Sequence, residues 1–215
     1  MQESSLHRSL KEVFSSVDSR QEVWVDGYLV DVSSGNQIIE IQTGSFYKIK
    51  PKLEALLPTH QILLVHPIAR EKWICRRDGQ QVRRRRSPRR GRFEDLYYEL
   101  VGIPRLLVHP NLTLEVIFIQ VEEIWQNDGR GSWRRKGWSI VERQLVSILE
   151  RIVINRPDEL ARRLPSDLEE PFTVRELAEK AKLNPRLAAK MTYCLTEMGV
   201  LQIVGKRGRS RLFTR

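Results

Sequence analysis

Residues 22–42 read EVWVDGYLVDVSSGNQIIEIQ. The first part, to Val32, is rich in β-branched and aromatic side chains, a composition that predicts a strand. Residues 33–36 supply turn-forming side chains, and residues 37–42 return to a strand pattern. We therefore expect an antiparallel hairpin whose turn is centred on the Gly-Asn pair.

The sequence on both sides of this hairpin predicts an α/β fold. Helical spacing of apolar residues predicts a helix over residues 4–17 and another from Ser45 to Pro58. Residues 62–65 are wholly apolar, as is typical of a buried central strand. We also expect a short helix over 93–100 and strands over 106–108 and 114–121. The order of helix, hairpin, helix and strand favours a mixed sheet.

The last third of the chain has a different pattern. Apolar residues between Ile140 and Ile152 recur at helical spacing, which predicts a helix from Ser139 onward. Thr173 and Glu176 form a capping box, and Asn184 caps a further helix that ends at Gly199. A hairpin with a basic tip follows. We therefore place a domain boundary between two units, residues 1–137 and 138–215.

Positive charge is concentrated in two segments. The chain has 37 Lys and Arg against 27 Asp and Glu, a net charge of +10. Residues 76–92 hold nine arginines against one acid, and residues 205–215 hold five further cations. Charge gathered in this way indicates a polyanionic ligand. We expect DNA, with RNA as an open alternative.

Several functional classes are poorly supported. No apolar run approaches the ~20 residues of a membrane span, and the first residues do not resemble a secretory signal. Cys75 and Cys194 lie far apart, which predicts neither a disulfide framework nor a zinc site. Nucleotide-binding glycine motifs do not occur. We expect a cytoplasmic protein without a membrane partner.

Two acidic residues of the hairpin have the spacing of a metal site. The turn places Asp31 opposite Glu40 to within one register step, and Gln42 shares a face with Glu40 because strand side chains alternate. Paired carboxylates bind Mg²⁺ or Mn²⁺ through oxygen, and such a cation activates water and neutralises phosphate charge. Asp31 also lies on an otherwise apolar face, where an unpaired carboxylate is costly. Asp26 is the rival aspartate.

This arrangement resembles the PD-(D/E)xK nuclease superfamily, whose fold is restriction-endonuclease-like. The resemblance covers residues 4–65 and implies that Asp31 and Glu40 are the motif acids, with Gln42 in the usual lysine position. Gln42 is neutral and cannot supply the positive charge. The resemblance allows a lysine of the following helix instead, with Lys48 and Lys52 as candidates and Lys50 as a weaker one. Glu3 or Glu12 is a candidate third acid, and His7 lies near both in sequence.

Residues 139–215 resemble the winged helix-turn-helix family, which implies DNA contacts from the third helix and the wing. The helix would contribute Arg186, Lys190 and Tyr193. The arginine segment would add further contacts. The remaining candidate nucleic-acid contacts are Arg83, Arg84, Arg85, Arg86, Arg89 and Arg90, together with Lys206, Arg207, Arg209 and Arg211 of the wing.

Together these patterns predict a metal-dependent DNA endonuclease that acts on duplex or branched DNA. The alternative is a DNA-binding regulator or adaptor built on an inactive nuclease fold. The sequence leaves open a homodimer or a partner protein.

Overall fold

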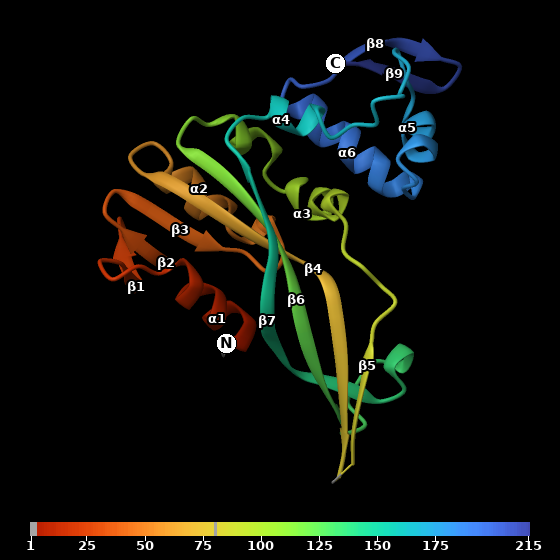
Figure 1. The fold of residues 1–215 in the computed structure, drawn as a ribbon. Coiled ribbons are helices and arrows are strands. Elements are labelled where there is room, and N and C mark those ends of the chain that lie inside the picture. Colours follow the sequence, from red (N-terminus) through yellow and green to blue (C-terminus); the bar gives the residue numbers. More distant parts are fainter. Residues whose placement is uncertain (1–3, 80) are drawn as a thin grey trace.

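The computed structural model describes residues 4–79 and 81–215, and a large mixed sheet dominates it (Figure 1). The strands of this sheet are β1 (Arg20–Val25), β2 (Tyr28–Ser34), β3 (Gln37–Ile41), β4 (Gln61–Asp78), β5 (Gln81–Arg86), β6 (Leu112–Asn127) and β7 (Trp138–Ile154). Their spatial order is β1-β2-β3-β4-β6-β7, and β5 pairs with the far end of β4. The β3–β4 and β4–β6 pairs are parallel, and the other pairs are antiparallel. The mixed α/β class expected from the sequence is confirmed.

Helices cover both faces of the sheet. The α-helices are α1 (Ser5–Phe14), α2 (Lys50–Leu56), α3 (Tyr97–Leu100), α4 (Asp158–Ala161), α5 (Val174–Lys180) and α6 (Pro185–Glu197), and the short 3-10 helices are η1 (Phe46–Lys48), η2 (Phe93–Leu96), η3 (Pro104–Val108) and η4 (Trp133–Arg135). Leu53 of α2 packs in one buried cluster with Ile38, whereas Leu10 of α1 packs in another with Ile39. Consecutive strand residues point to opposite faces, so α1 and α2 lie on opposite sides of β3.

The expected hairpin is present, with one correction. β2 and β3 pair with Ser34 opposite Gln37, so the Gly-Asn pair forms the turn and Gly35 has a φ of +58°. The preceding stretch is not one strand. Asp26 and Gly27, both with positive φ, form a two-residue turn between β1 and β2. An Asp-Gly pair is favoured in such turns because both central residues require positive φ.

β4 to β7 extend far beyond the body of the molecule as an arm (Figure 1). We define the arm as residues 70–92 and 119–144. The arginine-rich segment, residues 76–92, contains the end of β4 and all of β5, and β5 pairs with β4 from Trp73 to Asp78. The glycine-rich basic turn over residues 129–137 connects β6 to β7 and contains η4. The strand expected over 106–108 is wrong, since these residues belong to η3.

The helix expected from Ser139 is also wrong. Residues 138–154 form β7, which pairs with β6, so the sheet extends past the boundary expected after residue 137. The register shifts three times along this pair, and each shift leaves one extra residue in β7. Leu145 and Ile148 consequently pack on the same face although they are three residues apart. Such bulges convert a strand period of two into a spacing that imitates a helix.

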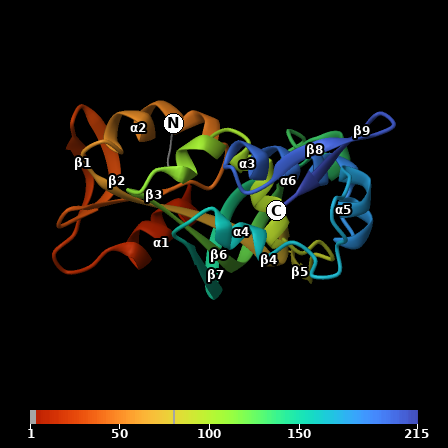
Figure 2. The same ribbon diagram turned by 90° about the horizontal axis from the view of Figure 1, so that it is seen from above.

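The C-terminal region contains α4, α5, α6 and a hairpin of β8 (Gln202–Arg207) and β9 (Ser210–Thr214). The Thr173 capping box and the Asn184 cap are both confirmed by hydrogen bonds to backbone N–H groups. Gly199, with a φ of +73°, follows α6 as expected. Figure 2 shows this region on the opposite side of the molecule from β1 and α2. Across residues 4–79 and 81–215, each helix is too short or too polar to cross a membrane.

Candidate functional site

The β2–β3 hairpin brings Asp31 to Glu40. The β2–β3 ladder runs as far as Val32 opposite Ile39, and beyond it Asp31 lies close enough for its carboxylate to raise the pKa of Glu40. Asp31 Oδ2 accepts a hydrogen bond from the backbone N–H of Ile41 at 2.8 Å. The Asp31 carboxylate is thereby fixed against the strand that carries Glu40.

Helix α1 contributes His7 to this site. His7 Nε2 lies 3.2 Å from Asp31 Oδ2 and 2.9 Å from the carbonyl oxygen of Ile41. The sequence placed His7 near the candidate third acids but did not indicate this contact, which depends on how α1 packs on the sheet. Of those acids, Glu12 is exposed on α1, and Glu3 lies outside the described residues.

Glu40 is buried, with 3% of its surface exposed, and it forms an ion pair with Lys52 of α2. Lys52 also donates a hydrogen bond to the carbonyl of Leu29. Burial, followed by the neighbouring Asp31 carboxylate, raises the pKa of Glu40 to about 7, while the Lys52 ammonium opposes the shift. Two like charges in a desolvated setting resist full ionisation, and a bound cation relieves that cost.

Lys48, Lys50 and Gln42 form no ion pair or hydrogen bond with Glu40 in the part of the chain that the structure describes. Lys48 is exposed on η1, and Lys50 lies 3.7 Å from Glu54 on its own helix. The side-chain amide of Gln42 donates to the carbonyl of Ser45 at 2.7 Å. Of the lysines proposed from the sequence, Lys52 is therefore the one that pairs with Glu40.

Asp26 is separated from the carboxylate pair by its position in the β1–β2 turn. Its Oδ2 lies 2.7 Å from His60 Nε2, and its side chain is largely exposed. The structure thus brings Asp31, and not Asp26, to Glu40.

Asp31 and Glu40 are the side chains of this site that could offer carboxylate oxygens to a divalent cation. The described residues contain no group of three or more His, Cys, Asp or Glu side chains arranged to hold a metal. Mg²⁺ commonly uses only one or two carboxylates and takes its remaining ligands from water and substrate phosphates. Asp31 and Glu40 match that requirement.

The expected nucleic-acid contacts are spread over two ends of the molecule. Arg83 to Arg86 lie on β5 of the arm, and Arg89 and Arg90 are exposed in the segment that follows. The β8–β9 hairpin lies at the opposite end (Figure 1). Its exposed cations are Lys206, Arg207, Arg209 and Arg211, of which Arg207 pairs with Glu176 at 2.6 Å.

The expected contact face of α6 is only partly open. Arg186 is exposed, and Tyr193 is 48% exposed. Lys190 Nζ, however, lies 5.9 Å from the ring centre of Tyr98, because α6 packs against α3. This side of α6 therefore serves partly as an internal contact.

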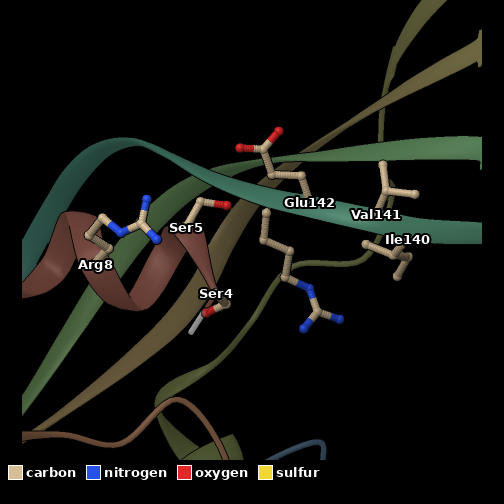
Figure 3. A pocket seen from close by; sticks show the side chains of 7 residues that line it. Ser4, Ser5, Arg8, Ile140, Val141 and Glu142 are labelled. Atoms are coloured by element: carbon tan, nitrogen blue, oxygen red, sulfur yellow. The ribbon is translucent and has the colours of Figure 1, made fainter. Parts of the chain in front are cut away.

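A separate surface pocket lies between the start of α1 and β7 (Figure 3). Its lining includes Ser4, Arg8, Val141 and Glu142. It contains neither member of the Asp31–Glu40 pair, so we assign the candidate chemistry to the hairpin.

The fold and site define a mixed α/β protein with one buried carboxylate, Glu40, and one partly exposed carboxylate, Asp31, on a β-hairpin. The chain belongs to the family described as "Domain of unknown function (DUF8091)", whose model matches residues 4–155. It is 34% identical over 215 residues to an uncharacterized protein of Treponema pallidum (strain Nichols), covering 98% of this chain and 84% of that relative. No solved structure matches the chain. The family match ends one residue after β7 and so includes the described strands of the large sheet.

Proposed function

We propose that this protein is a metal-dependent endonuclease that hydrolyses phosphodiester bonds in DNA. The observation that carries the proposal is the buried Glu40, which lies beside Asp31 and is paired with Lys52. A buried carboxylate with a raised pKa, next to a second carboxylate and a lysine, is more typical of a reactive site than of a stabilising contact.

In this proposal Asp31 and Glu40 hold Mg²⁺ or Mn²⁺. The bound cation would activate a water and neutralise charge on the scissile phosphate. Gln42 is neutral, so the positive charge of the site comes from Lys52. Lys52 lies on α2 and forms an ion pair with Glu40. His7 orients Asp31 through its Nε2 contact.

The order of elements supports a PD-(D/E)xK assignment for the N-terminal part. α1, β1, β2, β3, α2 and β4 follow one another, and the two acids lie on β2 and β3. The three C-terminal helices and the β8–β9 hairpin support a winged-helix assignment for residues 158–214. Basic residues at the tip of that hairpin suit contacts to DNA phosphates.

One observation favours a second candidate, DNA binding without cleavage. His7 Nε2 lies within hydrogen-bond distance of both Asp31 Oδ2 and the carbonyl oxygen of Ile41. A donor held there competes with a cation for those oxygens. Under this alternative the hairpin acids are structural, and the basic surfaces retain their role.

A cleavage assay with matched variants tests the proposal. We expect Asp31→Asn and Glu40→Gln to reduce Mg²⁺-dependent cleavage of supercoiled or branched DNA on the order of 100-fold or more, with DNA binding retained. Asp26→Asn is the control, since Asp26 is an aspartate of the neighbouring turn. Lys52→Gln should also reduce cleavage, whereas Lys48→Gln should not.

Two results contradict the proposal. If the wild-type protein binds DNA but does not cleave it with Mg²⁺ or Mn²⁺, binding without cleavage is favoured. If Glu40→Gln cleaves as fast as the wild type, the site lies elsewhere.

A further inference from the structure

The two faces of the arm differ in charge. Across the β4–β5 ladder Arg76 pairs with Arg83, and Ile74 with Arg85, so these side chains lie on one face. We call this the arginine face. Cys75 pairs with Arg84 on the other face, which we call the paired face.

On the paired face two of the cations, Arg84 and Arg86, are neutralised by neighbouring acids. Arg84 Nε donates to Glu122 at 2.6 Å, and its guanidinium lies 4.0 Å from the ring centre of Trp73. Arg86 forms an ion pair with Glu71. Three cations, Arg77, Arg84 and Arg86, share this face with three acids, Glu71, Glu122 and Glu142.

The arginine face carries an excess of positive charge. Its five cations are Lys72, Arg76, Arg83, Arg85 and Arg143, and its two acids are Asp78 and Glu123, which leaves +3. Glu123 is already engaged by both Lys72 and Arg143. Within residues 4–79 and 81–215, Arg83 and Arg85 have no carboxylate at ion-pair distance.

A small pocket at the end of this face contains aromatic and cationic groups. Arg76, Asp78, Gln81, Arg83 and Trp138 line it. The Arg76 guanidinium lies 5.4 Å from the ring centre of Trp125 and 5.1 Å from that of Trp138. Arg76 Nε is buried, and its N–H donates no hydrogen bond to any of the described residues. The pocket thus offers a pre-positioned guanidinium to a phosphate.

An exposed tryptophan lies on the connection that leads into this pocket. Trp133 of η4 is 82% exposed, and the guanidinium of Arg134 lies 5.4 Å from its ring centre. Arg135 Nε donates to the carbonyl of Trp138 at 3.1 Å, which ties the connection to the start of β7. Exposed aromatic rings beside a row of cations are the elements from which single-strand binding surfaces are built.

We propose that the arm binds single-stranded nucleic acid, with phosphates on Arg76, Arg83 and Arg85 and a base stacked on Trp133. A single strand is favoured over a duplex because an exposed ring can stack only on a base whose face is free. The inference rests on the nucleic-acid ligand of the proposed function and specifies its strand state. A branched substrate supplies such a strand next to a duplex.

Fluorescence anisotropy tests whether the arginine face of the arm contributes more to nucleic-acid binding than the paired face does. The protein carries Glu40→Gln so that binding is measured without cleavage, and the probes are labelled oligothymidylate and a duplex of equal length. We expect Arg83→Gln with Arg85→Gln to weaken single-strand binding about tenfold and to reduce its salt slope by about 1.4, near 0.7 per lost phosphate contact. Arg84→Gln with Arg86→Gln removes the same charge from the same strand and should weaken binding less than about threefold.

Arg77→Gln is a second control, since Arg77 is exposed on the paired face and forms no ion pair with the residues that the structure describes. Equal losses from substitutions on the two faces would mean diffuse electrostatic attraction and would overturn the inference. Because the assay does not use cleavage, this outcome is independent of whether Asp31 and Glu40 are catalytic.

Trp133→Ala tests the stacking contact. We expect about tenfold weaker binding to the single strand and unchanged binding to the duplex. The control is Trp24→Ala, because Trp24 is 74% exposed on β1, outside the arm. Tighter binding to the duplex than to the single strand, with no effect of Trp133→Ala, would overturn the proposal.

Discussion

At the scale of single residues, Glu40 is the group whose placement most needs explanation. A buried carboxylate is costly unless it is paired, and Lys52 offsets only part of that cost, because the pKa of Glu40 remains raised to about 7. A carboxylate in such a position is destabilising when it is ionised, and perturbed carboxylates of this kind cluster at functional sites. This is the physical reason for assigning it to the site.

The raised pKa has a measurable effect on stability. Because the pKa of Glu40 rises from 4.5 to about 7 on folding, the folded chain binds more protons within that window, and stability falls as pH increases through it. Glu40→Gln lacks this titration. We expect the unfolding free energy of the variant, relative to that of the wild type, to rise by about 3 kcal/mol between pH 4.5 and pH values above 7.

Urea unfolding across that pH range gives the measurement. A difference in unfolding free energy that does not change with pH would show that burial does not perturb Glu40.

At the scale of elements, local signals determine the helix ends of the C-terminal region. The Thr173 hydroxyl accepts from the N–H of Glu176, and the Glu176 carboxylate accepts from the N–H of Thr173 at 2.7 Å. These bonds satisfy backbone donors that α5 cannot pair internally. The ends of α5 and α6 were therefore predictable from short sequence motifs.

We expect Thr173→Ala to lower the free energy of unfolding by about 1 kcal/mol, because it removes the cap of α5. Chemical denaturation followed by circular dichroism gives the value. Thr43→Ala is a suitable control, since Thr43 is exposed and lies outside the helices. An equal effect from both substitutions would contradict a capping role.

At the scale of the whole molecule, the C-terminal helices and the sheet share one core. Leu100 of α3 lies in the same buried cluster as Leu187 of α6 and Leu114 of β6. Asn184 donates to the Tyr98 hydroxyl at 3.0 Å, and Arg92 donates to the carbonyls of Ala181 and Lys182. α6 is therefore held in a fixed position against the body that carries the carboxylate pair.

This shared core has a consequence for unfolding. We expect Leu100→Ala to cost about 2 to 5 kcal/mol and to lower hydrogen-exchange protection in α6 and in β4 together. Val82→Ala, at an exposed position of β5, should change stability by less than about 0.5 kcal/mol. Loss of protection in α6 alone would show two independently unfolding parts.

The arm and the β8–β9 hairpin project from opposite ends of the molecule (Figure 1). The two basic segments of the sequence do not form one continuous patch. A nucleic acid that contacts both would have to run along the length of the molecule.

The sequence by itself determined the features that depend on neighbouring residues. The Gly-Asn turn joins β2 to β3 and so brings Asp31 near Glu40, and the caps at Thr173 and Asn184 begin two helices. Each follows from backbone geometry within a few residues.

Tertiary structure alone decided the features that depend on distant pairing. β7 resembles a helix in sequence because bulges against β6 change its period. Lys52 pairs with Glu40 because of the way α2 packs on the sheet. Arg84 of β5 pairs with Glu122 because of the way β6 lies beside β4. Long-range packing sets these contacts, and no local pattern of residues encodes them.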